Sequence, residues 1–150
     1  MIKTMFVCHG NICRSTMAEF VFKDMVKKRG IADQFQIESS ATSREEIGND
    51  THHGTKRQLD KMNISYTRRN ATQIIKDDLE NFDYILAMDS NNLRNLHRMF
   101  GNSYDYKIHL LLDFADTKGD IADPWYTGNF DETYNDVVRG LEGFLTHCKF

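Results

Sequence analysis

Proline, cysteine and long apolar runs are all scarce in this sequence of 150 residues. The longest apolar runs are only a few residues, as in Leu110–Leu112, whereas a membrane span needs about 20 and a secretory leader needs an apolar stretch near its start. A basic excess is missing too, because 19 Lys and Arg residues stand against 22 Asp and Glu residues, a formal net charge of −3. We therefore expect a cytoplasmic protein that uses no membrane and does not bind nucleic acid mainly through phosphate contacts.

The three cysteines are odd in number and too few for a disulfide-stabilised secreted fold. Cys8 and Cys13 do not form a Cys-x-x-Cys pair, and no second pair or His-Glu-x-x-His sequence supplies the other ligands of a zinc site. We therefore expect intracellular thiols, no metal and no cofactor, with Cys148 in the core. The only proline, Pro124, stands between Asp123 and Trp125 and singles out that position.

Hydrophobic residues make up 40% of the chain, and a chain of this length buries roughly 68 to 70% of its unfolded surface, which suffices for one core. No repeat or linker divides the sequence, so residues 1–150 are expected to form one domain. Apolar, β-favouring segments alternate with helical patterns, which predicts an α/β fold with a parallel sheet. The predicted strands are 2–7, 34–40, 84–88 and 107–112. Helices are predicted from a cap at Ser15 or Thr16 to Gly30, and behind Asp131 to Cys148.

The segment Cys8–Ser15, called the Cys8 loop below, connects the first predicted strand to the first predicted helix. A thiol and a guanidinium are six positions apart in it, and Gly10 and Asn11 permit left-handed backbone. Such a loop can turn N–H groups inward as an anion site, to which the helix end adds roughly half a positive elementary charge. Arg14 could then grip two phosphate oxygens while Cys8 attacks phosphorus in line.

The same positive surroundings favour a thiolate, which makes Cys8 a candidate nucleophile. Ser15 could donate its hydroxyl to the Cys8 sulfur, and Asn11 could brace the loop through its side-chain amide. The alternative is a buried thiol at a strand end beside an ordinary surface arginine. The spacing of Cys8 and Arg14 alone does not decide between these two interpretations.

Several motifs, in order along the whole chain, resemble those of the low-molecular-weight protein tyrosine phosphatases. They comprise residues 8–15, 17–19, 40–43, 47–49, 82–89, 92–94 and 123–126 and the final helix. The resemblance implies a single-domain, flavodoxin-like α/β fold: a four-stranded parallel sheet of order 2-1-3-4, flanked by helices on both faces. It places the Cys8 loop at the carboxyl end of the first strand, where doubly wound sheets bind ligands.

The resemblance also implies a metal-free reaction in two steps. Cys8 attacks phosphotyrosine to give a phosphocysteine, and Asp123, on a loop fixed by Pro124, protonates the leaving phenolate and then activates water. The phosphate is held by Arg14 and by the rest of the loop, namely His9, Gly10, Asn11, Ile12, Cys13 and Ser15. Trp125 and Tyr126 would form an aromatic rim, although either could instead pack on the final helix. The implied partners are phosphotyrosine-containing proteins, with a tyrosine kinase as a further candidate.

Four positions depart from the family pattern. His9 replaces an apolar residue of the substrate slot, and an exposed histidine without a role is the alternative. Thr16 stands where proline is common, and its hydroxyl can still cap the helix. Arg69 stands where some relatives have a histidine that braces the loop, so that this support is either rebuilt or absent. The acid motif reads Asp-Pro-Trp-Tyr, with Trp125 in place of a first tyrosine.

Other functions remain open. A thiol-dependent arsenate reductase shares the loop and the fold but needs two more cysteines, and residues 75–112 contain none. A non-catalytic phosphotyrosine-binding module would be expected to lose the thiol or the acid, both of which are present. A small-molecule phosphatase is harder to separate, because the loop recognises only the phosphate. Family resemblance further implies a disulfide between Cys8 and Cys13 under oxidants, for which the alternative is a structural thiol at Cys13.

Overall fold

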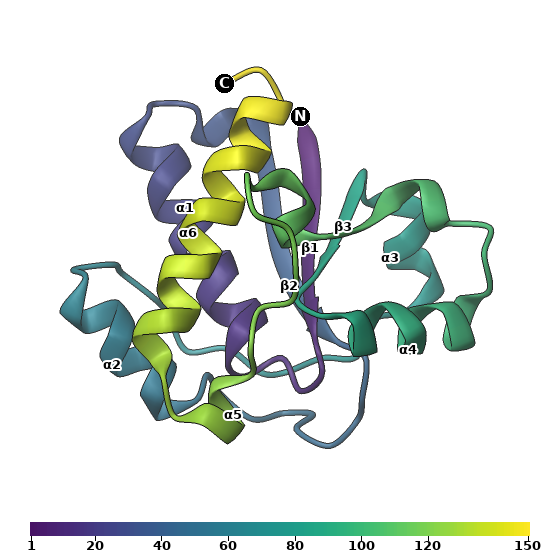
Figure 1. Cartoon of the computed structure of the whole chain (residues 1–150), viewed down its shortest axis with the longest axis horizontal. Helices are drawn as coiled ribbons and strands as arrows, with labels where there is room; N and C mark the ends of the chain where they lie inside the picture. The colour runs from purple at the N-terminus through teal and green to yellow at the C-terminus, as the bar shows by residue number, and fades with distance from the viewer.

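Four parallel strands form the centre of the computed structural model, which describes residues 1–150 (Figure 1). Their order is β2-β1-β3-β4, and β1 pairs in parallel with both β2 and β3. The strands are β1 (Ile2–Cys8), β2 (Phe35–Ala41), β3 (Tyr84–Ala87) and β4 (Ile108–Leu110). The predicted fold class, a parallel sheet of order 2-1-3-4 between helices, is therefore confirmed.

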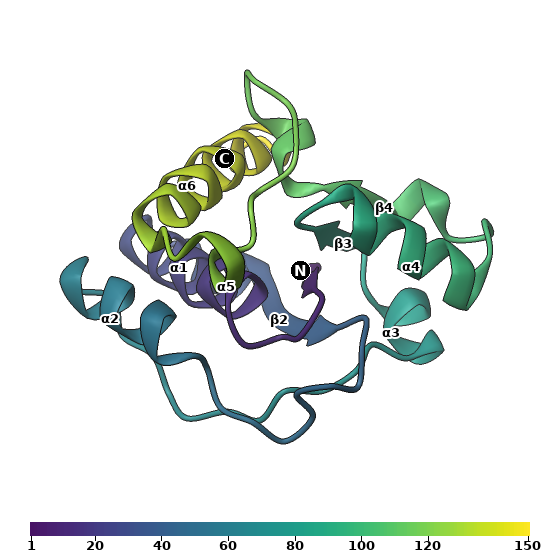
Figure 2. The same ribbon diagram turned by 60° about the horizontal axis from the view of Figure 1, so that its bottom comes forward.

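Helices cover both faces of this sheet. The α-helices are α1 (Arg14–Lys28), α2 (His53–Lys61), α3 (Lys76–Asn81), α4 (Ser90–Phe100), α5 (Pro124–Thr127) and α6 (Phe130–His147). Short 3-10 turns occupy η1 (Ala32–Gln34), η2 (Asp105–Lys107) and η3 (Leu111–Phe114). Helices α1 and α6 pack on one face, α3 and α4 lie on the other, and α2 flanks α1 and α6 (Figures 1 and 2). None of the helices is both long enough and apolar enough to cross a membrane.

Strand β1 is buried on both faces, and its alternate side chains enter two separate cores. Phe6 and Cys8 pack with α1 and α6 in the larger core, whereas Met5 and Val7 pack with α3 and α4 in the smaller one. This alternation is the period of two of an extended strand, and coverage on both sides explains why β1 is almost continuously apolar. The strand delivers Cys8 to the carboxyl edge of the sheet.

Helix α6 approaches η3 closely at two glycines. A Cβ atom at Gly140 would lie 2.7 Å from Leu111 Cγ, and one at Gly143 would lie 1.8 Å from the Phe114 carbonyl oxygen. Each glycine costs about 1 kcal/mol of helix propensity relative to alanine, and this close packing offsets that cost. The contact anchors the beginning of the segment that leads to Asp123.

Several predicted boundaries are wrong in detail. Neither Ser15 nor Thr16 caps α1, which begins at Arg14 without a side-chain cap. The Thr16 hydroxyl donates instead to the carbonyl oxygens of Ile12 and Cys13. Strand β4 stops at Leu110, where the backbone turns into η3 and the Leu110 N–H donates to Asp113. The helix end at Gly30 is confirmed, since Gly30 has a left-handed φ of 72°.

Candidate active site

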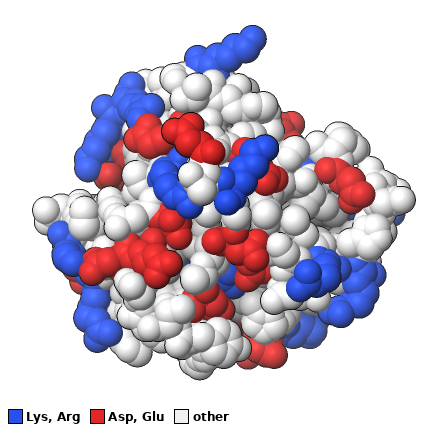
Figure 3. Space-filling model, in the orientation of Figure 1, with Lys and Arg blue, Asp and Glu red and all other residues white.

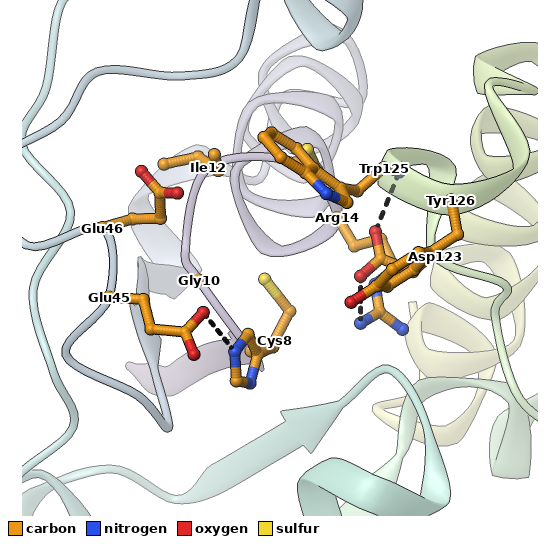
Figure 4. A pocket seen from close by; sticks show the side chains of 11 residues that line it. Cys8, Gly10, Ile12, Arg14, Glu45, Glu46, Asp123, Trp125 and Tyr126 are labelled. Atoms are coloured by element: carbon orange, nitrogen blue, oxygen red, sulfur yellow. Dashed lines mark hydrogen bonds and ion pairs between the residues drawn. The ribbon is translucent and has the colours of Figure 1, made fainter.

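A pocket of about 120 Å³ opens at the carboxyl end of the sheet, between the Cys8 loop and α5 (Figure 4). It is lined by Cys8, His9, Gly10, Ile12, Cys13, Arg14, Glu45, Glu46, Asp123, Trp125 and Tyr126. The three predicted catalytic groups therefore share one cavity, although Cys8 and Asp123 are 115 positions apart. Carboxyl ends of strands are the usual ligand site of a doubly wound sheet.

The backbone of the Cys8 loop curls around the thiol. Asn11 adopts a left-handed φ of 60°, and its N–H group donates to Cys8 Sγ over 3.3 Å. Gly10 is not left-handed, contrary to what the sequence suggested. Its Cβ would instead meet Glu46 Cγ at 3.2 Å, so that glycine here allows the close approach of a neighbouring loop.

Asn11 and Ser15 lie behind the pocket and hold its floor. Both are fully buried. The Asn11 side-chain amide donates to Ser15 Oγ at 2.8 Å and to Ser39 Oγ at 2.9 Å, and Ser15 Oγ is 3.1 Å from Cys8 Sγ. Ser39 in turn donates to the buried carboxylate of Glu19 at 2.5 Å. This buried chain connects the sulfur, the loop and helix α1.

Arg69 supports the Cys8 loop, a point that the sequence left undecided. Its guanidinium donates to Asn11 Oδ1 at 3.0 Å, to the Asn11 carbonyl oxygen at 3.3 Å and to the Ser39 carbonyl oxygen at 3.2 Å. Arg69 Nε also lies 3.6 Å from a Glu19 carboxylate oxygen. Three oxygens thus fix the guanidinium against the outer side of the Cys8 loop. The sequence identified Arg69 as a departure but could not show these partners.

Arg14 is buried to 98% and is held by carboxylates on two sides. Its Nη1 donates to Asp89 Oδ2 at 2.6 Å and to the Ile121 carbonyl oxygen at 2.8 Å, and its Nη2 lies 3.4 Å from Asp123 Oδ2. Burial disfavours the charged guanidinium, but attraction to Cys8, Asp89 and Asp123 outweighs it and raises the pKa of Arg14. Arg14 Nε has no partner.

The segment Asp123–Tyr126, called the Asp123 loop below, forms the opposite wall of the pocket. Asp123 caps α5, where its Oδ1 accepts the Trp125 N–H at 3.0 Å, and Pro124 occupies the first position of that helix. Trp125 and Tyr126 remain 57% and 84% exposed. Both line the pocket, and neither is buried against the final helix.

Two acidic residues on the pocket rim were not predicted from the sequence. Glu45 lies 2.8 Å from His9 Nε2, and Glu46 stands beside Gly10 and Ile12 on the same side of the opening (Figure 4). Both glutamates follow β2 within an irregular segment, which offered no periodicity for assigning their direction. His9 is accordingly engaged at the rim and is not a free histidine.

None of the three cysteines forms a disulfide in the structure. Burial, reinforced by the negative charges of Cys8 and Asp123, raises the pKa of the Cys13 thiol to about 12. Cys13 therefore stays protonated at neutral pH, although it lines the same pocket as Cys8. Cys148 caps the carboxyl end of α6 and is half-buried, so the prediction of a core residue is only partly correct.

No group of three or more His, Cys, Asp or Glu side chains is close enough to hold a metal ion. The site instead combines a thiol, the Asn11 backbone N–H directed at it, and a buried arginine beside a carboxyl group. Together with the doubly wound sheet, these groups make an α/β site that can bind an anion beside a thiol.

Comparison with known proteins identifies the family. The family model for low molecular weight phosphotyrosine protein phosphatase matches residues 3–149. The chain is 40% identical over 147 residues to a low molecular weight protein-tyrosine-phosphatase of Bacillus subtilis, YfkJ, covering 97% of this chain and 94% of that protein. It is also 40% identical over 146 residues to the chicken low molecular weight phosphotyrosine protein phosphatase, covering 94% and 92%. The chain belongs to this family of hydrolases.

Solved structures agree with that assignment. The crystal structure of YfkJ from Bacillus subtilis superposes with a TM-score of 0.94 at 39% identity, covering 99% of this chain and 95% of that one. A phosphatase of the same family from Streptococcus pyogenes gives a TM-score of 0.89 at 44% identity, covering 98% and 93%. A Drosophila arginine phosphatase is similar at a TM-score of 0.90 and 30% identity, covering 99% of each chain.

Proposed function

We propose that this protein hydrolyses phosphotyrosine in proteins through a covalent phosphocysteine on Cys8. The observation that carries the proposal is the position of Arg14, which is buried between the Cys8 loop and Asp123 with Nε free of any partner. A buried donor without an acceptor is costly, about 1 to 3 kcal/mol. A phosphate oxygen bound beside Cys8 would satisfy it.

In the first step, the Cys8 thiolate attacks phosphorus from the side opposite the tyrosine oxygen. A sulfur–phosphorus bond forms as the phosphorus–oxygen bond breaks, and the electron pair leaves with the phenolate. The Asn11 N–H, 3.3 Å from Sγ, and the nearby Ser15 hydroxyl support the anionic sulfur. Arg14 and the loop amides balance the charge on the equatorial oxygens.

Asp123 supplies the proton that the phenolate takes up. Its carboxyl group faces the pocket at the start of α5, opposite Cys8 (Figure 4). In the second step, the resulting carboxylate accepts a proton from water, and the water oxygen attacks phosphorus to release Cys8 and inorganic phosphate. Asp123 thus serves first as the acid and then as the base of the two-step transfer.

Phosphotyrosine fits this pocket better than phosphoserine. The sulfur lies below a rim of exposed aromatic side chains, Trp125 and Tyr126, so that a long aryl ester reaches Cys8 while its ring contacts the rim. Phosphotyrosyl, phosphoseryl and phosphoarginyl peptides of one sequence should be compared by kcat/KM. Phosphotyrosine should be the preferred substrate, and efficient hydrolysis of either other peptide would contradict this specificity.

A substrate-trapping experiment tests the function and the partners together. Asp123→Ala should form the complex but turn it over slowly, and it should retain phosphotyrosyl proteins from a lysate, a tyrosine kinase among the candidates. The double variant Cys8→Ser/Arg14→Ala is the matched control, because it lacks the nucleophile and the phosphate fork. Equal retention by the trap and the control would contradict the proposed function. A cytoplasmic location is part of this proposal.

An arsenate reductase is disfavoured by the position of the remaining thiol. Cys148 lies at the end of α6. It is close enough to Tyr84, the first residue of β3, for the negative charge of its thiolate to raise the pKa of that tyrosine. That is the amino end of the sheet, opposite the pocket, and no other cysteine besides Cys13 is available to relay a disulfide. A purely binding function is disfavoured because Cys8, Arg14 and Asp123 are all present.

We further propose that Cys13 protects Cys8 from irreversible oxidation. Peroxide converts the Cys8 thiolate into a sulfenic acid, and attack by Cys13 sulfur then forms a disulfide and expels water. Cys8 loses its negative charge in the first step, which removes one of the causes that keep Cys13 protonated. Activity lost to peroxide should return with a thiol reductant. Recovery of Cys13→Ser as complete as that of the parent would contradict the protective role.

A further inference from the structure

His52 contacts four segments around the site but does not line the pocket itself. Its backbone N–H donates to the Ile12 carbonyl oxygen in the Cys8 loop at 2.8 Å. Its side chain caps α2, with Nδ1 accepting the Gly54 N–H at 2.9 Å. The imidazole ring also packs edge-on against Trp125 of the Asp123 loop, with ring centroids 5.5 Å apart at 73°.

Further aromatic contacts surround the His52 ring. The His52 ring stacks on Phe130, the first residue of α6, at 5.6 Å and 15°, and on His53 at 4.2 Å and 26°. Gly54 leaves room for Phe130, since a Cβ there would lie 2.2 Å from the Phe130 ring. A single imidazole therefore connects the Cys8 loop, α2, α6 and the Asp123 loop.

The capping bond requires His52 to be neutral. Nδ1 accepts the Gly54 N–H through the lone pair that a proton would occupy, so the bond and the proton exclude each other. Burial, followed by repulsion from His53 and Arg57, lowers the pKa of His52 below its usual value, whereas Glu46 and Asp123 act weakly in the opposite direction. These four groups are the charged neighbours that act on the ring.

We propose that neutral His52 is a positioning residue that holds Trp125, and through it Asp123, over the Cys8 loop, and that protonation of His52 releases this wall. The added proton binds Nδ1 and displaces the Gly54 N–H, which frays the first turn of α2 and removes the ring from Trp125. This inference rests on the proposed function only for its effect on catalysis, because the movement itself concerns the resting protein.

The sign of the pH effect follows from linkage. The folded protein binds a proton at His52 less readily than the unfolded chain, so the contribution of His52 to stability is complete above the ordinary histidine range. It is lost as the pH falls through the lowered pKa of His52. The Asp123 loop should accordingly loosen in mildly acidic solution while the core stays folded.

Trp125 provides a direct readout because it is the only tryptophan. Its fluorescence should follow one transition below the ordinary histidine pKa of 6.5, since protonation removes the His52 ring from the indole and changes the surroundings of Trp125. His52→Asn keeps a capping oxygen for the Gly54 N–H but cannot titrate, so this transition should vanish. The matched control His53→Asn should keep the transition and shift it to higher pH, because one repelling charge is removed.

A transition that persists unchanged in His52→Asn would overturn the proposal, whatever the activity of the protein. If that variant does not fold, the histidine ring resonances of the parent decide, and a His52 pKa at or above the ordinary value would overturn it. Kinetics give a further readout. His52→Asn should lose about tenfold in kcat/KM on phenyl phosphate, which needs the acid, and little on a phosphate ester with a strongly acidic phenol.

A flat fluorescence titration in a protein that hydrolyses phosphotyrosine normally would refute the role of His52 and leave the proposed function intact. The reverse outcome, a titration as expected without phosphatase activity, would refute the proposed function and leave the role of His52 in place. The two experiments therefore fail independently.

Discussion

The two walls of the pocket are built in different ways. On one side, the Cys8 loop is almost entirely inside the protein, with Cys8 and Arg14 exposed by only 3% and 2%. Its polar groups are bonded to β2, α1 and Arg69. On the other side, Trp125 and Tyr126 are 57% and 84% exposed, and the Asp123 loop meets its surroundings through Arg14 and the His52 ring.

In the proposed mechanism, this difference separates phosphate binding from proton transfer. The Cys8 loop is preorganised, and its hydrogen bonds are made before any substrate arrives, which lowers the cost of binding and of charge development. The Asp123 loop has few fixed contacts and can adjust to the leaving group. Changes in the first wall should therefore impair every phosphate ester alike, whereas changes in the second should depend on the group that leaves.

The largest loss is expected from Cys8→Ser. A serine hydroxyl is far less acidic than a thiol and cannot supply the attacking anion, so kcat on any aryl phosphate should fall by more than about 100-fold. Circular dichroism should show an unchanged fold, because the substitution is nearly isosteric. Residual activity above about one hundredth of the parent would exclude the covalent mechanism.

The next largest loss is expected from Arg14→Lys. A lysine keeps the charge but loses the planar fork, and it cannot satisfy both Asp89 and the Ile121 carbonyl oxygen as the guanidinium does. We expect about a 100-fold decrease in kcat/KM, equal to about 2.7 kcal/mol of transition-state stabilisation. The decrease should be the same for substrates with good and poor leaving groups. Near-normal rates would place the guanidinium outside the reaction.

A smaller loss is expected from Arg69→Gln, which removes the brace behind Asn11. Hydrogen bonds to charged groups contribute about 1.5 to 3 kcal/mol, so losing about 2 kcal/mol in the transition state would lower kcat/KM by roughly 30-fold. Arg68→Gln is the matched control, because Arg68 is exposed and reaches only Asp50 at 3.8 Å. Similar rates for both variants would show that the brace does not support catalysis.

The smallest loss is expected from Trp125→Ala, which opens the exposed wall. Stacking adds about 0.5 to 1.5 kcal/mol beyond area burial, so kcat/KM on phosphotyrosyl peptides should fall by at most about tenfold. Small non-aromatic phosphates should be affected less, because they lose the support that Trp125 gives to Asp123 but no contact with a substrate ring. Equal losses on both kinds of substrate would mean that Trp125 acts by fixing Asp123 and not by contacting the substrate ring.

Local patterns along the sequence were sufficient to predict much of the first wall. A strand, a loop and a helix follow one another within about 30 residues, so β1, Cys8 and Arg14 belong to one continuous segment of the sequence. The fold class followed from the alternation of strands and helices together with the family motifs. The sequence predicts a fourth strand that extends to residue 112, because Leu111 and Leu112 are as apolar as the residues before them. In the structure, these two leucines pack under α6 in a 3-10 turn.

The second wall and the supports of the first depend on tertiary contacts. Arg69, Ser39 and Glu19 are far apart in sequence and meet only when β2 is paired and α1 packs on it. Glu45 and His52 lie in irregular backbone, where no period indicates the direction of a side chain. The capping role given to Ser15 failed for a related reason, since its hydroxyl is taken by Cys8 and Asn11.

The ion pair between Arg14 and Asp123 makes the carboxylate an internal competitor for the phosphate site. Asp123 Oδ2, 3.4 Å from Arg14 Nη2, occupies in the resting protein the guanidinium that a substrate oxygen would claim. In the proposed mechanism, binding exchanges one anion for another, and the displaced carboxyl group, now facing a phosphate dianion, takes up the proton needed for the leaving group. Substrate binding would thus itself protonate the acid. It follows that Asp123→Ala should bind inorganic phosphate more tightly than the parent while it catalyses less.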